Sequence, residues 1–358
     1  MTAAPVPVED AAMMDKLRSA WTAIWPHLWR WFAAITGALV IFGALAMFKG
    51  ANPFELYGDM WQSTFARPRS VTEIFVRLAP ITLAALAVVV PARAGMINVG
   101  GEGQVILGGI AAAGTALLLD QVLPGTAVVV AMLIAAIIAG AIWAGIAGLL
   151  RIGFNVNEAV TTLLLNFVAL DLMLFLIYQP WRESAAAQPA TRELVTSAKL
   201  PTLGATGVHV GLIFAVIAVV VIGFLLTKTR WGFKLQVVGG NAEAARRAAM
   251  PVTWLLLSAL LVGGALAGLA GMIEFAGTEY KLKSGFAMQL GYIGFLASWL
   301  ARHRPAGVLV AAFALAALSV AADSLQLDAG LPAATVNILT ALLLMAVLGW
   351  TQIRGRKS

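Results

Sequence analysis

Long apolar segments separated by short polar connections run through the whole chain. A helix needs roughly 20 apolar residues to cross a lipid bilayer. Segments that approach this length are predicted at about 31–48, 73–91, 96–118, 124–150, 157–179, 209–227, 252–274, 287–301, 306–323 and 331–350. The pattern therefore predicts an all-α, polytopic membrane protein with about ten transmembrane helices.

Two of these segments are weaker than the others. Segment 96–118 is rich in glycine and contains Glu102, and segment 287–301 is short. Non-helical backbone at membrane depth is tolerated only where protein or water covers it, so we expect one or both segments to be broken or re-entrant. The glycine-rich stretches at 100–109 and 285–294 also occupy corresponding places in two halves of the chain. Such symmetry is common in transporters and points to a binding region near the membrane midplane.

Charges in the connections predict the orientation of the chain. If the N-terminus is cytoplasmic, most of the 24 lysines and arginines fall on the cytoplasmic side, as the positive-inside rule requires. The C-terminus is then cytoplasmic as well. The predicted organisation is a cytoplasmic tail at 1–30, a transmembrane domain at 31–350 and a second cytoplasmic tail at 351–358. The longest outside loop, at about 180–208, is a predicted contact surface for an extracytoplasmic partner.

The first apolar segment has an alternative interpretation as a signal peptide. Ala44 and Ala46 offer a small-x-small cleavage site near its end. The tryptophans that precede the segment are typical of a membrane interface, and a retained segment gives a consistent topology. We therefore favour a transmembrane helix.

Composition narrows the class of protein further. The chain is 61% hydrophobic and only 11% charged, with a mean hydropathy of +0.89, which is typical of membrane proteins. The net charge of +7 comes from basic residues at the ends of apolar segments, so we expect membrane lipid and not nucleic acid as a contact. The chain has no cysteine, and His27, His209 and His303 lie far apart. Neither a disulfide framework nor a metal site is predicted.

Polar side chains occur inside two of the apolar segments. Asn98, Glu102 and Gln104 lie in the glycine-rich stretch 94–109. Each would be costly if it faced lipid, so each is expected to face protein or a water-filled pathway. Both interpretations remain open, and we take the three residues as candidates for a substrate pathway.

A second polar group opens the segment at 157–179. Asn157 can cap this helix, and Glu158, Thr162 and Asn166 follow at intervals of four, so they form one stripe on the helix. A capping role accounts for Asn157 and Glu158 without any function. Asn166 and the deeper Asp171 face either a helix interface or a pathway. We take Glu158, Thr162 and Asn166 as further candidates for the substrate pathway.

The densest group of basic residues lies in segment 227–251, which cannot be inside lipid. The sequence predicts a short extended entry, a turn at Gly239-Gly240 and a helix of about two turns capped by Asn241. Glu243 in the first turn is placed to pair with Arg247 four residues later. A short capped helix between two long apolar segments is a predicted docking element.

No catalytic motif is present. The chain contains no GxxxxGK[ST] sequence, no HExxH sequence and no recognisable Ser/His/Asp set. The protein is therefore not predicted to be an enzyme. If ATP drives its activity, another subunit must hydrolyse the ATP.

Several of these stretches resemble one known family. GMINVGGEGQ, NEAVTTLLLNF and TRWGFKLQVVGGNAEAARRAAMP are similar to signatures of the inner-membrane permeases of bacterial ABC importers for nucleosides and simple sugars, the ribose and basic-membrane-protein-linked group. The resemblance continues into LAGLAG and GYIGFLASWLARHRPAG and covers about residues 70–350. The chain departs from the family pattern where Gln236 replaces an arginine and where Met250-Pro251 replaces Gly-Ile.

The resemblance implies a permease in the bacterial inner membrane that binds no cofactor itself and imports a nucleoside or related solute. ATP would be used by a partner subunit with two nucleotide-binding halves, and a second related permease would complete a heterodimer. An extracytoplasmic solute-binding protein would deliver the solute. The loop at 228–250 would be the coupling helix that contacts the ATPase, through Gly239, Asn241, Glu243, Arg246 and Arg247.

Two alternatives remain at this stage. The first is a simple-sugar or branched-chain amino-acid permease of the same family. The second is an ion-coupled secondary carrier, in which Glu102, Glu158 and Asp171 would be the coupling carboxylates.

Overall fold

The computed structural model describes residues 52–328 without a gap, together with residues 36, 37, 39–44, 46–48, 50, 338, 341, 342 and 345. The chain divides into two compact units, one of Met1–Trp61 with Leu325–Ser358 and the other of Gln62–Ser324. In the first unit, α2 spans Pro53–Trp61.

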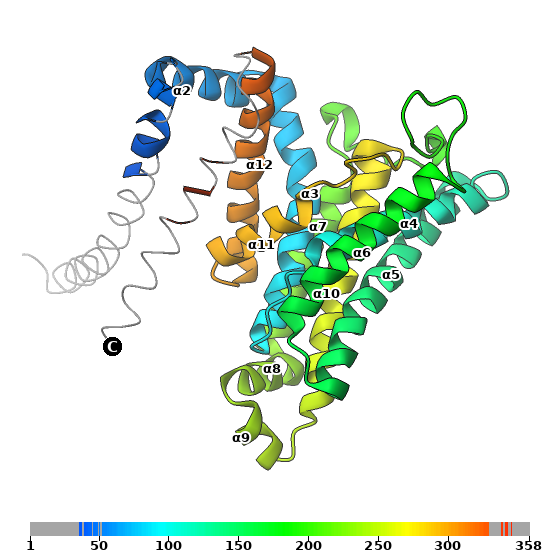
Figure 1. The fold of residues 1–358 in the computed structure, drawn as a ribbon, viewed down its shortest axis with the longest axis vertical. Coiled ribbons are helices and arrows are strands. Elements are labelled where there is room, and N and C mark those ends of the chain that lie inside the picture. Colours follow the sequence, from blue (N-terminus) through cyan, green and yellow to red (C-terminus); the bar gives the residue numbers. More distant parts are fainter. Residues whose placement is uncertain are drawn as a thin grey trace, which may run out of the picture. The chain divides into compact units, whose positions relative to one another are not determined.

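The rest of the described chain is helical, apart from connecting loops and two isolated β-bridges. In chain order, the elements are η1 (Gln62–Ala66), α3 (Pro68–Arg93), α4 (Gly101–Leu119), α5 (Gly125–Phe154), α6 (Glu158–Tyr178), η2 (Thr196–Ala198), η3 (Gly204–Thr206), α7 (Gly211–Lys228), α8 (Arg230–Gly240), α9 (Ala242–Arg247), α10 (Val252–Glu274), η4 (Phe275–Glu279), α11 (Leu290–Leu300) and α12 (Pro305–Asp328). Figure 1 shows them in sequence colours. The predicted all-α class is confirmed.

Seven helices of the described residues are long and apolar enough to cross a membrane. An eighth span results if the bent pair Leu39–Phe48 and Pro53–Ala66, with an angle of 117°, counts as one. The predicted span at 331–350 lies almost entirely outside the described residues. The predicted span at 287–301 contains only the 11-residue helix α11, and the one at 96–118 begins with non-helical residues at 96–99.

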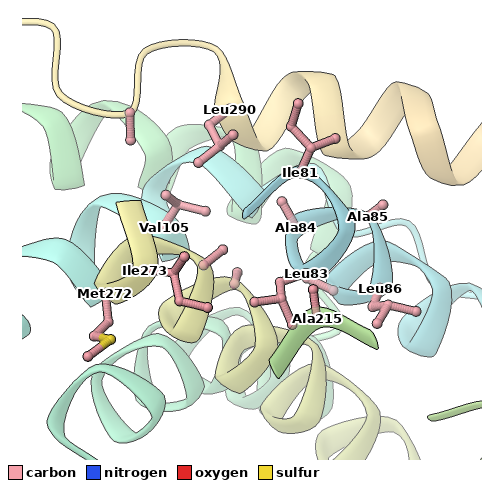
Figure 2. Close-up of a cluster of buried hydrophobic side chains, with 14 of the residues drawn as sticks. Ile81, Leu83, Ala84, Ala85, Leu86, Val105, Ala215, Met272, Ile273 and Leu290 are labelled. Atoms are coloured by element: carbon pink, nitrogen blue, oxygen red, sulfur yellow. The ribbon is translucent and has the colours of Figure 1, made fainter. Parts of the chain in front are cut away.

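Helix α3 is the centre of the second unit. Its apolar window is 89% buried, and it packs against α7, α10 and α11. Because every residue from Leu78 to Pro91 is buried, this part of α3 is apolar all round and not amphipathic. Figure 2 shows side chains from α3 meeting those of its neighbours in one cluster, including Ile81, Leu83, Leu86, Val105, Ala215, Ile273 and Leu290.

Glycines bring α10 against α5 and α4 at backbone distance. A Cβ atom on Gly268 would lie 2.1 Å from the carbonyl oxygen of Ala136 in α5, and one on Gly271 would lie 1.9 Å from that of Val105 in α4. Small residues at this spacing permit close helix contact in membranes. The small side chains of α10 therefore allow its backbone to touch those of α5 and α4.

Replacing Gly268 with alanine should therefore destabilise the protein. The methyl group has no room unless α5 and α10 separate, and overpacking of this kind costs about 1–3 kcal/mol of unfolding free energy. The midpoint of thermal denaturation in detergent should fall.

Gly153→Ala is the matched control, because nothing lies within 4 Å of the position of its Cβ. This control should leave the midpoint unchanged or raise it, since alanine favours a helix over glycine by up to about 1 kcal/mol. Equal midpoints for the two variants would contradict the packing.

The segment before the predicted docking helix is itself helical, so the predicted extended entry and Gly239-Gly240 turn were wrong. α8 starts after Thr229, whose hydroxyl accepts a hydrogen bond from the N–H of Gly232 at 3.2 Å. Both glycines lie within the last turn of α8. A Cβ atom on Gly239 would lie 2.5 Å from the carbonyl oxygen of Arg93. The absence of a side chain at Gly239 therefore serves a contact between helices and not a turn.

The short capped helix forms as predicted. α9 follows α8 directly, and the side chain of Asn241 caps it by accepting a hydrogen bond from the N–H of Ala244 at 2.9 Å. Glu243 pairs with both Arg246 and Arg247 at 3.4 Å. Figure 1 shows α8 and α9 together at one end of the helices of this unit.

Candidate functional site

The candidate pathway residues meet around a short non-helical segment at 96–100, between the end of α3 and the start of α4. All six predicted side chains are buried. Their exposed fractions are 0% for Asn98, 8% for Glu102, 1% for Gln104, 5% for Glu158, 1% for Thr162 and 4% for Asn166. None of them faces outward, as the cost of polar groups in lipid requires.

Asn98 and Gln104 form a reciprocal amide pair inside this site. Each side-chain amide donates a hydrogen bond to the other's carbonyl oxygen at 3.0 Å. Asn98 also donates to the carbonyl oxygen of Ala87 in α3, at 3.2 Å, and accepts from the N–H of Gly100 at 3.0 Å. The pair therefore ties the segment to the helices on either side of it.

The polar stripe of α6 replaces the backbone hydrogen bonds that the non-helical segment lacks. Glu158 accepts from the N–H of Ile97 at 3.2 Å, and the hydroxyl of Thr162 accepts from the N–H of Val99 at 3.2 Å. Backbone groups without water or a helical partner must be satisfied by other protein groups at membrane depth. The spacing of four residues on α6 thus brings Glu158 and Thr162 to two N–H groups of the non-helical segment, those of Ile97 and Val99.

Asn166 is the member of the stripe whose side chain contacts three different parts of the chain. Its carbonyl oxygen accepts from the N–H of Gly103 at 2.8 Å. Its amide donates to the carbonyl oxygen of Val99 at 3.0 Å and to the hydroxyl of Tyr292 at 3.2 Å. Asn166 therefore joins α6 to both α4 and α11.

Glu102 connects the two glycine-rich segments. Its carboxylate accepts hydrogen bonds from the N–H of Gln289 at 2.6 Å and from that of Gly291 at 2.7 Å. These donors lie at the N-terminus of α11, where the helix dipole favours an anion. A Cβ atom on Gly291 would lie 2.0 Å from the backbone nitrogen of Glu102. The starts of α4 and α11, predicted as corresponding parts of two halves, are thus in direct contact.

Two further residues of the site, Arg151 and Tyr292, are not indicated by the sequence patterns above. Arg151, at the end of α5, forms an ion pair with Glu158. The turn that joins them passes through Asn155 in the left-handed conformation, with φ of 55°. A basic residue seven positions before a buried glutamate, across a helix break, is a signal that could have been used. Tyr292 lies 126 residues from Asn166, so no local pattern indicates its contact.

The end of α8 touches the chain beside this site. Gly95 has φ of +74°, and a Cβ atom on it would lie 3.2 Å from the Cα atom and the carbonyl oxygen of Gly239. Gly95 immediately precedes the non-helical segment. A movement of α8 would therefore act on the backbone that leads into the site.

Helix α9 presents its charges to the exterior of the described structure. The side chains of Glu243, Arg246 and Arg247 are 60%, 62% and 82% exposed. Ala245 is 1% exposed and holds the helix against its neighbours. The arrangement is an anchored helix with a charged outer face.

The long connection at 179–210 lies at the other end of these helices (Figure 1). Arg192 fastens it to the end of α4, by an ion pair with Asp120 at 2.6 Å and a hydrogen bond to the carbonyl oxygen of Leu117 at 3.3 Å. The N–H of Thr191 donates to the carbonyl oxygen of Leu282 at 2.9 Å. The described residues contain no group of three or more His, Cys, Asp or Glu side chains that could hold a metal ion.

Comparison with known proteins identifies the family. Residues 70–348 match the family described as the branched-chain amino acid transport system / permease component. The chain is 37% identical to the glucose ABC transporter permease protein TsgB13 of Haloferax volcanii, over 88% of this chain and 85% of the relative. It is 32% identical to the guanosine ABC transporter permease protein NupP of Bacillus subtilis, over 87% and 90%. It is 28% identical to NupQ, a second guanosine ABC transporter permease protein of B. subtilis, over 80% and 92%.

The family match at 70–348 covers nearly all residues of the helices from α3 to α12 described above. The resemblance seen in the sequence motifs is confirmed at the level of the family. The chain therefore belongs to the branched-chain amino acid transport system / permease component family, and it is a multi-pass membrane permease subunit of an ABC importer and not itself an enzyme.

Proposed function

We propose that this permease forms the pathway for a nucleoside or a simple sugar in an ATP-driven importer of the bacterial inner membrane. Two relatives support this solute class, because one is named for glucose and the other for guanosine. Both solutes are uncharged and carry a sugar ring with several hydroxyl groups. The nucleoside is our first choice because the NEAVTTLLLN stretch resembles the longer permease of nucleoside systems.

The observation that carries the proposal is the contact between Gly239 and Gly95. It joins α8, and with it the exposed helix α9, to the backbone that enters the non-helical segment at 96–100. We assign α9 as the coupling helix, contacting an ATP-binding subunit with two nucleotide-binding halves. When that subunit closes on ATP, it would move α8. This movement would reach the site directly through the contact between Gly239 and Gly95. This permease would bind no cofactor of its own.

This assignment also gives the chain an orientation. The α8–α9 connection within 228–250 would be cytoplasmic, together with the tails at 1–30 and 351–358. The loop at 180–208 would then be outside, where it would receive the extracytoplasmic solute-binding protein. About ten helices between 31 and 350 would make up the transmembrane domain, including two that the described residues cover only in part or hardly at all.

The six buried polar residues would shape the pathway. They would not bind the solute themselves, because their side chains already have hydrogen-bond partners within the protein. A satisfied polar network fixes a single arrangement. In this proposal, Asn98, Glu102, Gln104, Glu158, Thr162 and Asn166 keep the 96–100 segment in a non-helical form. The solute would pass along the backbone that this network holds in place.

Uptake into vesicles tests the proposal. The permease should be reconstituted with its ATPase, its second permease and its solute-binding protein, and uptake of radiolabelled guanosine, glucose and leucine should be measured with ATP inside. We expect uptake of guanosine or glucose only when the ATPase is present. Leucine uptake would favour the branched-chain amino-acid alternative. Uptake by the permease alone, driven by a proton gradient, would overturn the proposal.

Glu102→Gln separates the importer from an ion-coupled carrier. A carrier that used Glu102 as its coupling carboxylate would lose ion dependence when the charge is removed. The importer should keep its ATP dependence, because the amide oxygen of glutamine still accepts one of the two backbone hydrogen bonds. The measurement is uptake in the same vesicles, with and without ATP and with and without a proton gradient.

A further inference from the structure

Helix α6 has an exposed face that does not suit lipid. Asp171 is exposed and lies inside the span, about 20 Å from Glu158 and about 10 Å from Tyr178 at the rise of an α-helix. Among the described residues, it has no hydrogen-bond or ion-pair partner. A charged side chain at that depth is costly in hydrocarbon and is normally turned toward protein or a water-filled space.

The surroundings of Asp171 on α6 are large and apolar. Phe167, Val168 and Phe175 are three or four residues away, so they share its face, and they are 58%, 52% and 59% exposed. The opposite face of α6 carries Thr162 and Asn166 and is buried against the non-helical segment. The helix therefore separates that segment from whatever covers Asp171.

The neighbouring exposed helices lack this feature. On α5, the exposed stripe is formed by Val130, Ile134, Ile138 and Ile142, and on α7 by Val216, Ile217, Val220 and Val221. These faces are uniformly apolar, as lipid contact requires. Of the exposed mid-span faces of α5, α6 and α7, that of α6 alone carries an ionisable group.

We propose that the Phe167–Asp171–Phe175 face of α6 is the surface on which a second, related permease chain packs. The inference rests on the proposed function. One organism, B. subtilis, has two different permeases that match this chain, NupP and NupQ. This is the expected situation for a permease that pairs with a relative. The partner surface would present large apolar side chains opposite the phenylalanines and a hydrogen-bond donor or a cation opposite Asp171.

The chain is suited to a direct test, because it has no cysteine. Single cysteines at Phe167 and Phe175 should be labelled with benzophenone maleimide in membranes that contain the whole transporter, then irradiated. We expect adducts whose peptides belong to a second permease of the family with a different sequence. Ile138→Cys and Val220→Cys are the matched controls on α5 and α7 and should give only lipid adducts. Peptides from this chain itself, or lipid adducts equal to the controls, would overturn the inference.

A second measurement does not depend on labelling. Asp171→Leu removes a charge from an exposed position, so it should leave the chain folded while the amount of second permease that copurifies falls several-fold. Ile138→Leu should leave copurification unchanged. If Asp171→Leu raised thermal stability without loss of the partner, the face would be lipid-exposed. In that case ATP-dependent uptake would persist, and only this inference would fail. Uptake without the ATPase would instead refute the proposed function, whatever α6 contacts.

Discussion

Reversing the charges of Arg246 and Arg247 together to glutamate should uncouple ATP hydrolysis from uptake. Both side chains are largely exposed, and each forms an ion pair with Glu243 at 3.4 Å. Because such exposed pairs are weak, most of their charge is available to a partner. A cationic face that meets acidic groups of the ATPase would become repulsive. We expect docking to weaken by at least about 1.4 kcal/mol, which is a tenfold change in the docking equilibrium, and the solute taken up per ATP hydrolysed to fall with it.

The fold should survive this change. Exposed substitutions that touch no cap or core usually alter the unfolding free energy by less than about 0.5 kcal/mol, and the caps of α9 at Asn241 and of α8 at Thr229 are untouched. The conservative variant with lysine at both positions is the control and should keep most of the coupling, because the charge remains. An unchanged ratio of uptake to ATP hydrolysis in the glutamate variant would refute α9 as the docking helix.

The second large effect is expected at Asn166. Its replacement by leucine would leave the N–H of Gly103 and the carbonyl oxygen of Val99 without partners, at a depth where water does not replace them. An unsatisfied buried group costs about 1–3 kcal/mol, so we expect a loss of about 2–5 kcal/mol of stability. The midpoint of thermal denaturation and the yield of folded protein should both fall sharply.

Thr161→Val provides the comparison on the same helix. The hydroxyl of Thr161 donates only to the carbonyl oxygen of Asn157, one turn earlier in the chain, so its loss should cost less than about 1 kcal/mol. The pair also separates two roles for Asn166. If Asn166→Leu lost uptake but kept the denaturation midpoint of the Thr161 variant, Asn166 would contact the solute and would not hold the 96–100 segment.

Local patterns in the sequence predicted most of the long helices and the caps of α6 and α9, although not α8. Asn157 and Asn241 cap α6 and α9 because their short side chains reach the free N–H groups of the first turn, a contact decided within three residues. The stripe of Glu158, Thr162 and Asn166 follows from helical geometry alone. Burial of polar residues at these positions could also be expected, since exposure to lipid would be costly.

Contacts between distant parts of the chain could not be predicted in the same way. Glu102 meets the N-terminus of α11 across 187 residues, and Gly239 meets Gly95 through a close approach that a single sequence does not record. The two glycines at 239 and 240 look like a turn because glycine favours one. Asn166 and Asp171 are five positions apart on one helix, and only the packing of α6 shows that the first is buried and the second exposed.

The glycine contacts described for the fold have a mechanical consequence. α10 touches α5 and α4 at backbone distance, α11 touches α4 at Gly291, and α10 touches α3 where a Cβ on Gly263 would lie 2.6 Å from the carbonyl oxygen of Ala87. Helices joined in this way have no flexible side chains between them to absorb sliding. These helices should therefore move as one rigid body. Alternation between inward and outward access would then arise from rocking of this body against its partner chains.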